Sequence, residues 1–234
     1  MNEASDRRTL LARTICGSHL WHMNHPGSDT DYFTIYQIPT TDILSGILKG
    51  DGAHFHPDPL TKTDEASFEI GHVVSQLVRS NPNFVWGVLS PIVNIGGDEL
   101  RRLREIVLRT PALTLVPPCL GMAHNQMRDV QHGITTDPYQ IQKKRCAAIR
   151  VLRFAIHWCE TGEPLFAPVS EAEATMETYN VLLERLDFAY RTSSLPKKVD
   201  DTLYREFLLD LRLKNLEDVA AVSASPRNSR GRRP

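Results

Sequence analysis

The fold is decided by one stretch, residues 16–32, which reads CGSHLWHMNHPGSDTDY. Asp29 and Asp31 lie two residues apart in it, at the start of an aromatic and β-branched run that predicts a strand over Asp31–Ile38. Alternate residues of a strand face the same side, so both carboxylates are expected on one face, about 6–7 Å apart. Like charges at this distance repel unless a cation lies between them, and Mg²⁺ and Mn²⁺ prefer carboxylate oxygens. The pair therefore indicates a divalent metal site.

A second feature of the same stretch is Gly17-Ser18, which follows an apolar run over Thr9–Cys16 and precedes a short helix. A glycine lets a phosphate group approach the backbone, and exposed N–H groups together with the Ser18 hydroxyl can bind it. The sequence therefore predicts a phosphate site beside the carboxylate pair.

Gly-Ser, ten intervening residues and Asp-x-Asp at the start of an aromatic strand resemble the signature of the DNA polymerase beta superfamily of nucleotidyltransferases. The resemblance covers roughly residues 10–195. Its later parts are similar to a narrower group of bacterial and phage nucleotidyltransferases, one branch of which is associated with RNA repair. The stretches that carry this similarity are TDEASFEI (63–70), GMAHNQM (121–127) and KKRCAAIRVLR (143–153).

The resemblance implies three catalytic carboxylates that also bind the metal. Asp29 and Asp31 are two of them, and Asp64 is the best positional match for the third, with Glu69 as the fallback. The third acid of such sites helps to bind the metal and takes the proton of the attacking hydroxyl. The alternative interpretation is that Glu69 is a solvated residue at a helix start and that Asp64 or Ser67 caps that helix.

The resemblance also implies a nucleotide site. Gly17 and Ser18 would hold the β- and γ-phosphates, with Ser28 close by. Lys143 and Arg150 lie seven residues apart on one face of a predicted helix, so both could reach triphosphate oxygens if that helix closes over the site. A solvated basic face is the alternative interpretation.

The implied activity is Mg²⁺-dependent transfer of a nucleotidyl group from a nucleoside triphosphate, such as ATP, to a hydroxyl on RNA, a protein or a small molecule, with release of pyrophosphate. A catalytically silent member of the fold that binds nucleotide or RNA is the main alternative. A metallohydrolase that holds Zn²⁺ or Mn²⁺ with His54, His56 and Asp58 is a further one. The sequence specifies neither the base, the acceptor nor the oligomeric state.

The order of the predicted strands and helices along the chain indicates an α+β fold. We expect a nucleotidyltransferase catalytic domain over 1–110, with a mixed sheet and flanking helices, a helical domain over 111–222 and a basic, disordered tail over 223–234. We expect helices over Ile70–Val78, Tyr139–Glu160 and Asp200–Lys214. Two further helices are predicted, one from an Asp98 N-cap through Val107 and one from a Ser170–Glu173 capping box to Tyr190. A buried strand is predicted over Phe84–Leu89 and a loop over Ser45–Lys62.

The charges nearly balance, with 27 Lys and Arg against 28 Asp and Glu in 234 residues. Because the last 12 residues hold four Arg and no acid, the preceding part carries 23 cations against 28 acids, a net −5. This excludes a broadly basic surface but leaves a basic tail able to contact an RNA backbone. No apolar run approaches roughly 18 residues, so we expect no membrane partner. The N-terminus lacks an apolar signal core, and the four Cys form no CxxC pair. Both features favour a cytoplasmic protein.

Overall fold

One mixed sheet organises the N-terminal half of the chain, and the computed structural model describes residues 8–47, 53–58 and 60–224. The strands span Thr9–Ile15 (β1), Thr30–Gln37 (β2), Ala53–Asp58 (β3), Thr63–Glu69 (β4) and Val93–Ile95 (β5). They lie in the order β3-β4-β2-β1-β5. β2 and β4 pair in parallel, whereas the other neighbouring pairs are antiparallel.

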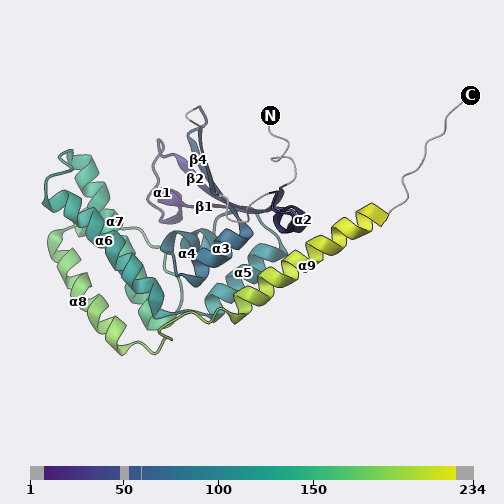
Figure 1. Ribbon diagram of the computed structural model, residues 1–234. Coiled ribbons are helices and arrows are strands. Elements are labelled where there is room, and N and C mark those ends of the chain that lie inside the picture. The colour runs from purple at the N-terminus through teal and green to yellow at the C-terminus, as the bar shows by residue number, and fades with distance from the viewer. Residues whose placement is uncertain (1–7, 48–52, 59, 225–234) are drawn as a thin grey trace, which may run out of the picture.

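Helices pack against this sheet and form most of the second half of the chain (Figure 1). They span Gly17–Leu20 (α1), Thr40–Leu44 (α2), Ile70–Val78 (α3), Pro82–Leu89 (α4), Asp98–Arg109 (α5), Val116–Gln131 (α6), Pro138–Thr161 (α7), Met176–Thr192 (α8) and Thr202–Ala224 (α9). The predicted α+β class, with the sheet N-terminal and the helices C-terminal, is therefore confirmed.

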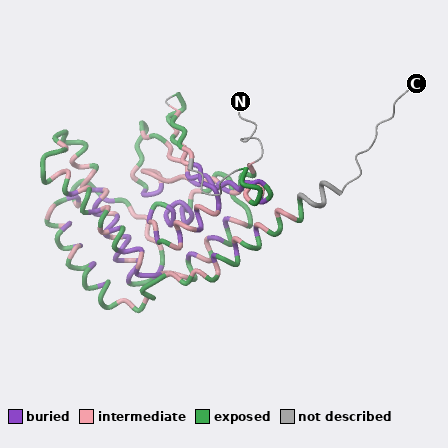
Figure 2. The backbone as a smooth tube through the Cα atoms, in the orientation of Figure 1, coloured by how far each residue is buried: buried purple, intermediate pink, exposed green. Residues whose placement is uncertain are grey.

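Aromatic side chains join the sheet to α4. Phe33 of β2 and Phe68 of β4 have ring centroids 5.1 Å apart, and Phe84 of α4 packs on these two rings at 5.5 and 4.7 Å. Gly87 permits this approach, since a Cβ there would lie 2.5 Å from the Phe33 ring. Buried residues gather in this layer and along α6 and α7, as the purple segments of Figure 2 show.

The buried strand predicted over Phe84–Leu89 is wrong, because these residues belong to α4. Asn81 caps that helix by accepting the Asn83 N–H, and Pro82 occupies its first turn. Every residue over Phe84–Leu89 is buried, so the helix lacks the polar face that would reveal its period, and its sequence looks like a buried strand.

The loop predicted over Ser45–Lys62 contains a strand, β3, which pairs with β4 at the edge of the sheet. Pro57 is tolerated there because an edge strand leaves one row of backbone groups unpaired. The nearby prolines and glycines hid the strand from the sequence. Residues 48–52 and 59 of this prediction lie outside the described residues.

The second half of the chain is built on α6, α7 and α8, which lie side by side (Figure 1). α7 matches the helix predicted over Tyr139–Glu160, with one more residue at each end. Asp137 caps its start, and Gly162, with φ of 75°, ends it. The capping box over Ser170–Glu173 is present, but it serves a 3₁₀ turn, and Thr175 caps α8.

The remaining helices differ from prediction mainly at their ends. The helix over Ile70–Val78 is confirmed as α3. Gly97 rather than Asp98 is the N-cap of α5, so the helix starts one residue earlier than predicted. α9 continues to Ala224, ten residues beyond the predicted end, and residues 225–234 of the predicted tail lie outside the described residues.

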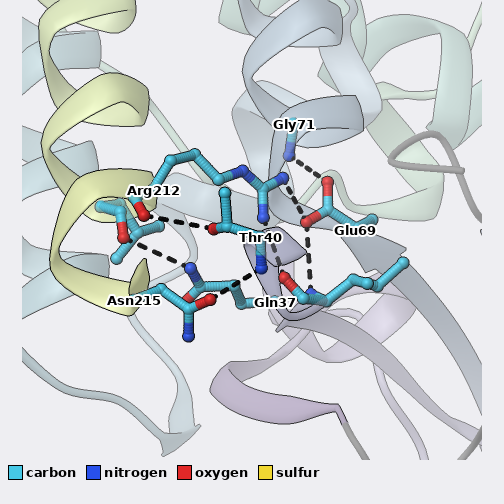
Figure 3. Close-up of polar contacts among 8 residues, drawn as sticks. Gln37, Thr40, Glu69, Gly71, Arg212 and Asn215 are labelled. Atoms are coloured by element: carbon cyan, nitrogen blue, oxygen red, sulfur yellow. Dashed lines mark hydrogen bonds and ion pairs between the residues drawn. The ribbon is translucent and has the colours of Figure 1, made fainter. Parts of the chain in front are cut away.

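α9 returns to the sheet and is anchored by a buried ion pair (Figure 3). Arg212 donates to Glu69, at the end of β4, over 2.5 Å, and Glu69 is fully buried. Beside this pair, Asn215 accepts the Thr40 N–H at 2.7 Å. α9 thus contacts α2, α3 and α5, and one continuous hydrophobic core crosses the domain boundary predicted at residue 110.

In the part of the chain that the structure describes, no single helix has both the length and the apolar character needed to cross a membrane. A sharply bent pair, Asp98–Arg109 with Leu113–Gln131 at 100°, meets these criteria only when the two segments are combined.

Candidate active site

The parallel pairing of β2 with β4 brings two of the predicted catalytic carboxylates together. Asp31 lies directly opposite Asp64 in the register. Residues paired in this way share one face of the sheet on strands about 4.8 Å apart. Burial raises the pKa of Asp31, and the negative charges of Asp64 and Asp29 raise it further, against smaller opposing effects of His19 and Lys143. The three acids therefore form one electrostatically coupled group.

Glu69, the fallback third carboxylate, lies at the opposite end of β4 from Asp64. Its side chain accepts the Gly71 N–H at 2.6 Å, which makes it the N-cap of α3, and it pairs with Arg212. The interpretation of Glu69 as a solvated residue is therefore wrong, because its counter-ion and its hydrogen bonds permit complete burial. Asp64 and Ser67 lie within the strand and do not cap the helix.

Gly17 lies against Asp31, and only glycine fits there. Its φ is +57°, in the left-handed region, and a Cβ at this position would lie 1.6 Å from Asp31 Oδ2. The Cys16 N–H donates to the Asp31 carbonyl oxygen at 2.8 Å, which fixes the turn to the strand. The turn and the carboxylate therefore set each other's position.

A cleft of about 760 Å³ separates these residues from α7, and we call it the polar cleft. One wall is formed by the three acids and the predicted phosphate residues, which are Asp29, Asp31, Asp64, Gly17, Ser18 and Ser28. Lys143 and Arg150 of α7 line the other wall. Every predicted site residue except Glu69 thus lies around one cavity.

The two predicted cations face this cleft without a carboxylate partner among the described residues. The neighbouring Lys144 is already paired with Asp129 at 2.6 Å, whereas Lys143 is exposed and forms no such pair. The guanidinium of Arg150 lies 5.2 Å from the Trp21 ring centroid, and its Nε has no hydrogen-bond partner in the described structure. Burial lowers the pKa of Arg150 to about 10. Because a partly buried cation without a carboxylate partner is desolvated without an ionic contact in return, this arrangement favours an anionic ligand.

A second cavity, of about 870 Å³, shares Gly17, Asp31, Asp64 and Arg150 with the polar cleft. We call it the aromatic pocket. The rings that line it come from the C-cap of α1, β2, β3, β4, α3 and α4, and they include Trp21, Phe55, Phe68, His72, Phe84 and Trp86. The local sequence does not predict this pocket, because residues 84–89 resemble a strand and residues 53–58 resemble a loop.

The described residues contain no group of three or more His, Cys, Asp or Glu side chains already arranged to hold a metal ion. Mg²⁺ is usually bound by one or two carboxylates, with water and substrate phosphates as its other ligands. The facing carboxylates Asp31 and Asp64, with Asp29 beside them, fit an ion of this kind that binds together with a nucleotide.

The alternative metal site on His54, His56 and Asp58 lies on β3 rather than in the predicted loop. The two imidazole rings stack with centroids 6.2 Å apart. Burial, the cation Arg8 and His56 lower the pKa of His54. The positive charge of Arg8 beside the His54 imidazole disfavours a metal cation there. The His54, His56 and Asp58 position therefore suits a metal less well than the cluster of Asp29, Asp31 and Asp64 does.

The site has the features of the nucleotidyltransferase class. These features are a mixed sheet with facing aspartates, a glycine turn against one of them and a cationic helix across the cleft. Residues 2–213 match the profile of the RNA repair pathway DNA polymerase beta family (RlaP). The chain belongs to this family, which confirms the resemblance drawn from residues 16–32. No curated protein shows significant similarity to the chain.

Proposed function

We propose that the protein is a metal-dependent nucleotidyltransferase, which transfers a nucleoside monophosphate from a nucleoside triphosphate to a hydroxyl acceptor and releases pyrophosphate. The observation that carries this proposal is the polar cleft. It has three carboxylates on one wall and, on the other, two cations that pair with no carboxylate in the described part of the chain. The two walls come from segments more than 70 residues apart. Family membership supports the same class of activity.

In the proposed reaction, the cationic residues of the cleft bind the phosphates and the acidic residues bind the metal. Lys143 and Arg150 bind the β- and γ-phosphates, Arg150 with its planar fork and Lys143 as a point charge, and Ser18 donates its hydroxyl to the same oxygens. Asp29, Asp31 and Asp64 would hold Mg²⁺ or Mn²⁺. When bound, the metal neutralises phosphate charge and makes the acceptor hydroxyl more acidic.

Transfer of label from each α-phosphate-labelled nucleoside triphosphate to a pool of RNA and protein acceptors, in the presence of Mg²⁺, tests the proposal. We expect a labelled product that Asp31→Asn abolishes. The matched control is Asp187→Asn on α8, where an exposed carboxylate pairs with Arg191 away from the polar cleft, and it should retain full transfer. Unchanged transfer by Asp31→Asn would refute the assignment. Nucleotide binding without transfer to any acceptor would instead identify the catalytically silent alternative.

A further inference from the structure

The aromatic pocket lies on the side of the active site from which an acceptor must attack, and this step rests on the proposed function. In phosphoryl transfer, the attacking and leaving oxygens lie roughly in line through phosphorus. The cations of α7 place the leaving pyrophosphate in the polar cleft. The aromatic pocket meets the polar cleft at Asp31, Asp64 and Arg150, and most of its other lining residues belong to β3, β4, α3 and α4 on the far side of the aspartates from Lys143. The attacking hydroxyl therefore enters from the aromatic pocket.

The walls of this pocket suit a flat aromatic group. The rings of Phe68 and His72 are stacked at 5.9 Å with planes 10° apart, and Phe84 lies within 5.4 Å of both. Phe55, on the edge strand, is 70% exposed and offers a free ring face. Phe68 and Phe84 are themselves buried and form the floor of the pocket, so Phe55 supplies the accessible ring, and an exposed ring of this kind is a stacking platform for a nucleobase.

Polar groups in the pocket can contact the edge of such a base. Gln76 accepts from the Asn81 side chain at 3.0 Å, and its own amide N–H groups have no partner among the residues that the structure describes. Asn83 also lines the pocket and is exposed. The indole N–H of Trp86 is buried without a hydrogen-bond partner among the described residues. Uncharged donors and acceptors beside aromatic walls recognise a base, because each base carries both kinds of group on its edge.

Charge and size distinguish this pocket from a second phosphate site. Among the described Lys and Arg residues, Arg150 alone lines it, and Arg150 lies where the pocket meets the polar cleft. Its volume of about 870 Å³ lies within the usual range of small-molecule sites. A serine or threonine side chain of a protein acceptor would leave most of this space and its ring faces uncovered.

We propose that the aromatic pocket binds the nucleobase of the acceptor, so that the attacking hydroxyl belongs to a nucleoside unit at the end of a nucleic acid. The hydroxyl oxygen forms a bond to the α-phosphorus, and its proton passes to Asp64. The bond from the α-phosphorus to the bridging oxygen breaks, and pyrophosphate leaves with that electron pair beside Lys143. Phe55 and Asn83 are then specificity-determining residues for the acceptor.

Binding of free nucleosides to the full chain tests this inference without catalysis. Two of the three Trp residues, Trp21 and Trp86, line the pocket, so titration with adenosine, guanosine, cytidine and uridine should change the tryptophan fluorescence in a saturable way with at least one of them. Phe55→Ala should weaken this binding about tenfold or more, as loss of a stacking ring does. The matched control is Phe188→Ala on α8, which is 69% exposed and outside the pocket, and it should bind like the wild type.

Competition separates the acceptor from the nucleoside triphosphate. A non-hydrolysable triphosphate with Mg²⁺ should bind together with the nucleoside, and competitive displacement would show that the pocket takes the triphosphate's own base, which overturns the inference. Absence of nucleoside binding while label is transferred to a protein overturns it as well, and leaves the proposed function intact. If the wild-type protein binds nucleosides but transfers no nucleotidyl group, the result counts against the proposed function alone.

Discussion

Substitution of Gly17 by alanine tests whether the glycine turn positions the catalytic carboxylate. The added Cβ would lie 1.6 Å from Asp31 Oδ2, whereas a carbon and an oxygen in contact lie about 3.3 Å apart. The Asp31 carboxylate must therefore move by about 1.7 Å, or the turn must move away from it. Either change separates Asp31 from the position at which it faces Asp64.

Two effects of different size follow from Gly17→Ala. A left-handed conformation costs a residue with a Cβ roughly 1–2 kcal/mol, which should lower the free energy of unfolding by that amount. A displacement of about 1 Å in a catalytic group lowers a rate by about 100-fold, so we expect nucleotidyl transfer to fall by at least that factor. Stability should thus change modestly, whereas the transfer rate should nearly vanish.

Gly46→Ala separates strain from displacement. Gly46 also has a positive φ, of 73°, but a Cβ there would meet nothing within 4 Å. Urea denaturation should show a similar loss of stability in both alanine variants, and labelled transfer should show a large loss only in Gly17→Ala. If Gly17→Ala transfers label at the wild-type rate, or if both variants lose activity equally, the inferred role of the turn is refuted.

Two further predictions concern stability. Glu69→Gln removes the fully buried charge that pairs with the partly buried Arg212, so the free energy of unfolding should fall by about 3 kcal/mol. Asp210→Asn, whose pair with Arg102 is largely exposed, should cost less than about 1 kcal/mol. Equal losses in urea denaturation would contradict the importance of burial. Because the pKa of Asp31 is raised, the folded chain binds its proton more tightly than the unfolded chain, and stability falls as pH rises above about 3.8. Asp31→Asn should therefore unfold at higher urea than the wild type at pH 7, with a difference that disappears in acid, and a lower midpoint at pH 7 would refute this reasoning.

The sequence was informative where residues close along the chain form the site. Gly17, Ser18, Asp29 and Asp31 occupy one short segment with a characteristic spacing, so their proximity could be predicted. Asp64 required the parallel register of β2 and β4, which no local pattern specifies, and the family resemblance provided it. Lys143 and Arg150 could be placed on one helix face, but only the structure shows that this face borders the cleft.

The aromatic pocket could not be predicted, because its walls come from several elements, two of which had been assigned incorrectly. A helix buried on all sides, such as the one that holds Phe84–Leu89, has no amphipathic period, so its sequence, which includes the pocket residues Phe84 and Trp86, resembles a strand. The role of Glu69 was hidden for a different reason. Its counter-ion Arg212 lies 143 residues further along the chain, and sequence spacing over such a distance carries no information about contact.

That separation between Glu69 and Arg212 also bears on the order in which the chain matures during synthesis. β4 carries Asp64 near one end and Glu69 at the other. The positive partner of Glu69 is Arg212, which belongs to α9. Until that helix leaves the ribosome, burial of Glu69 would leave a charge without a counter-ion, which strongly disfavours closing this end of the sheet. We therefore expect the sheet, although it precedes α9 in the chain, to settle only after α9 has been synthesised, as contacts between distant segments generally form slowly.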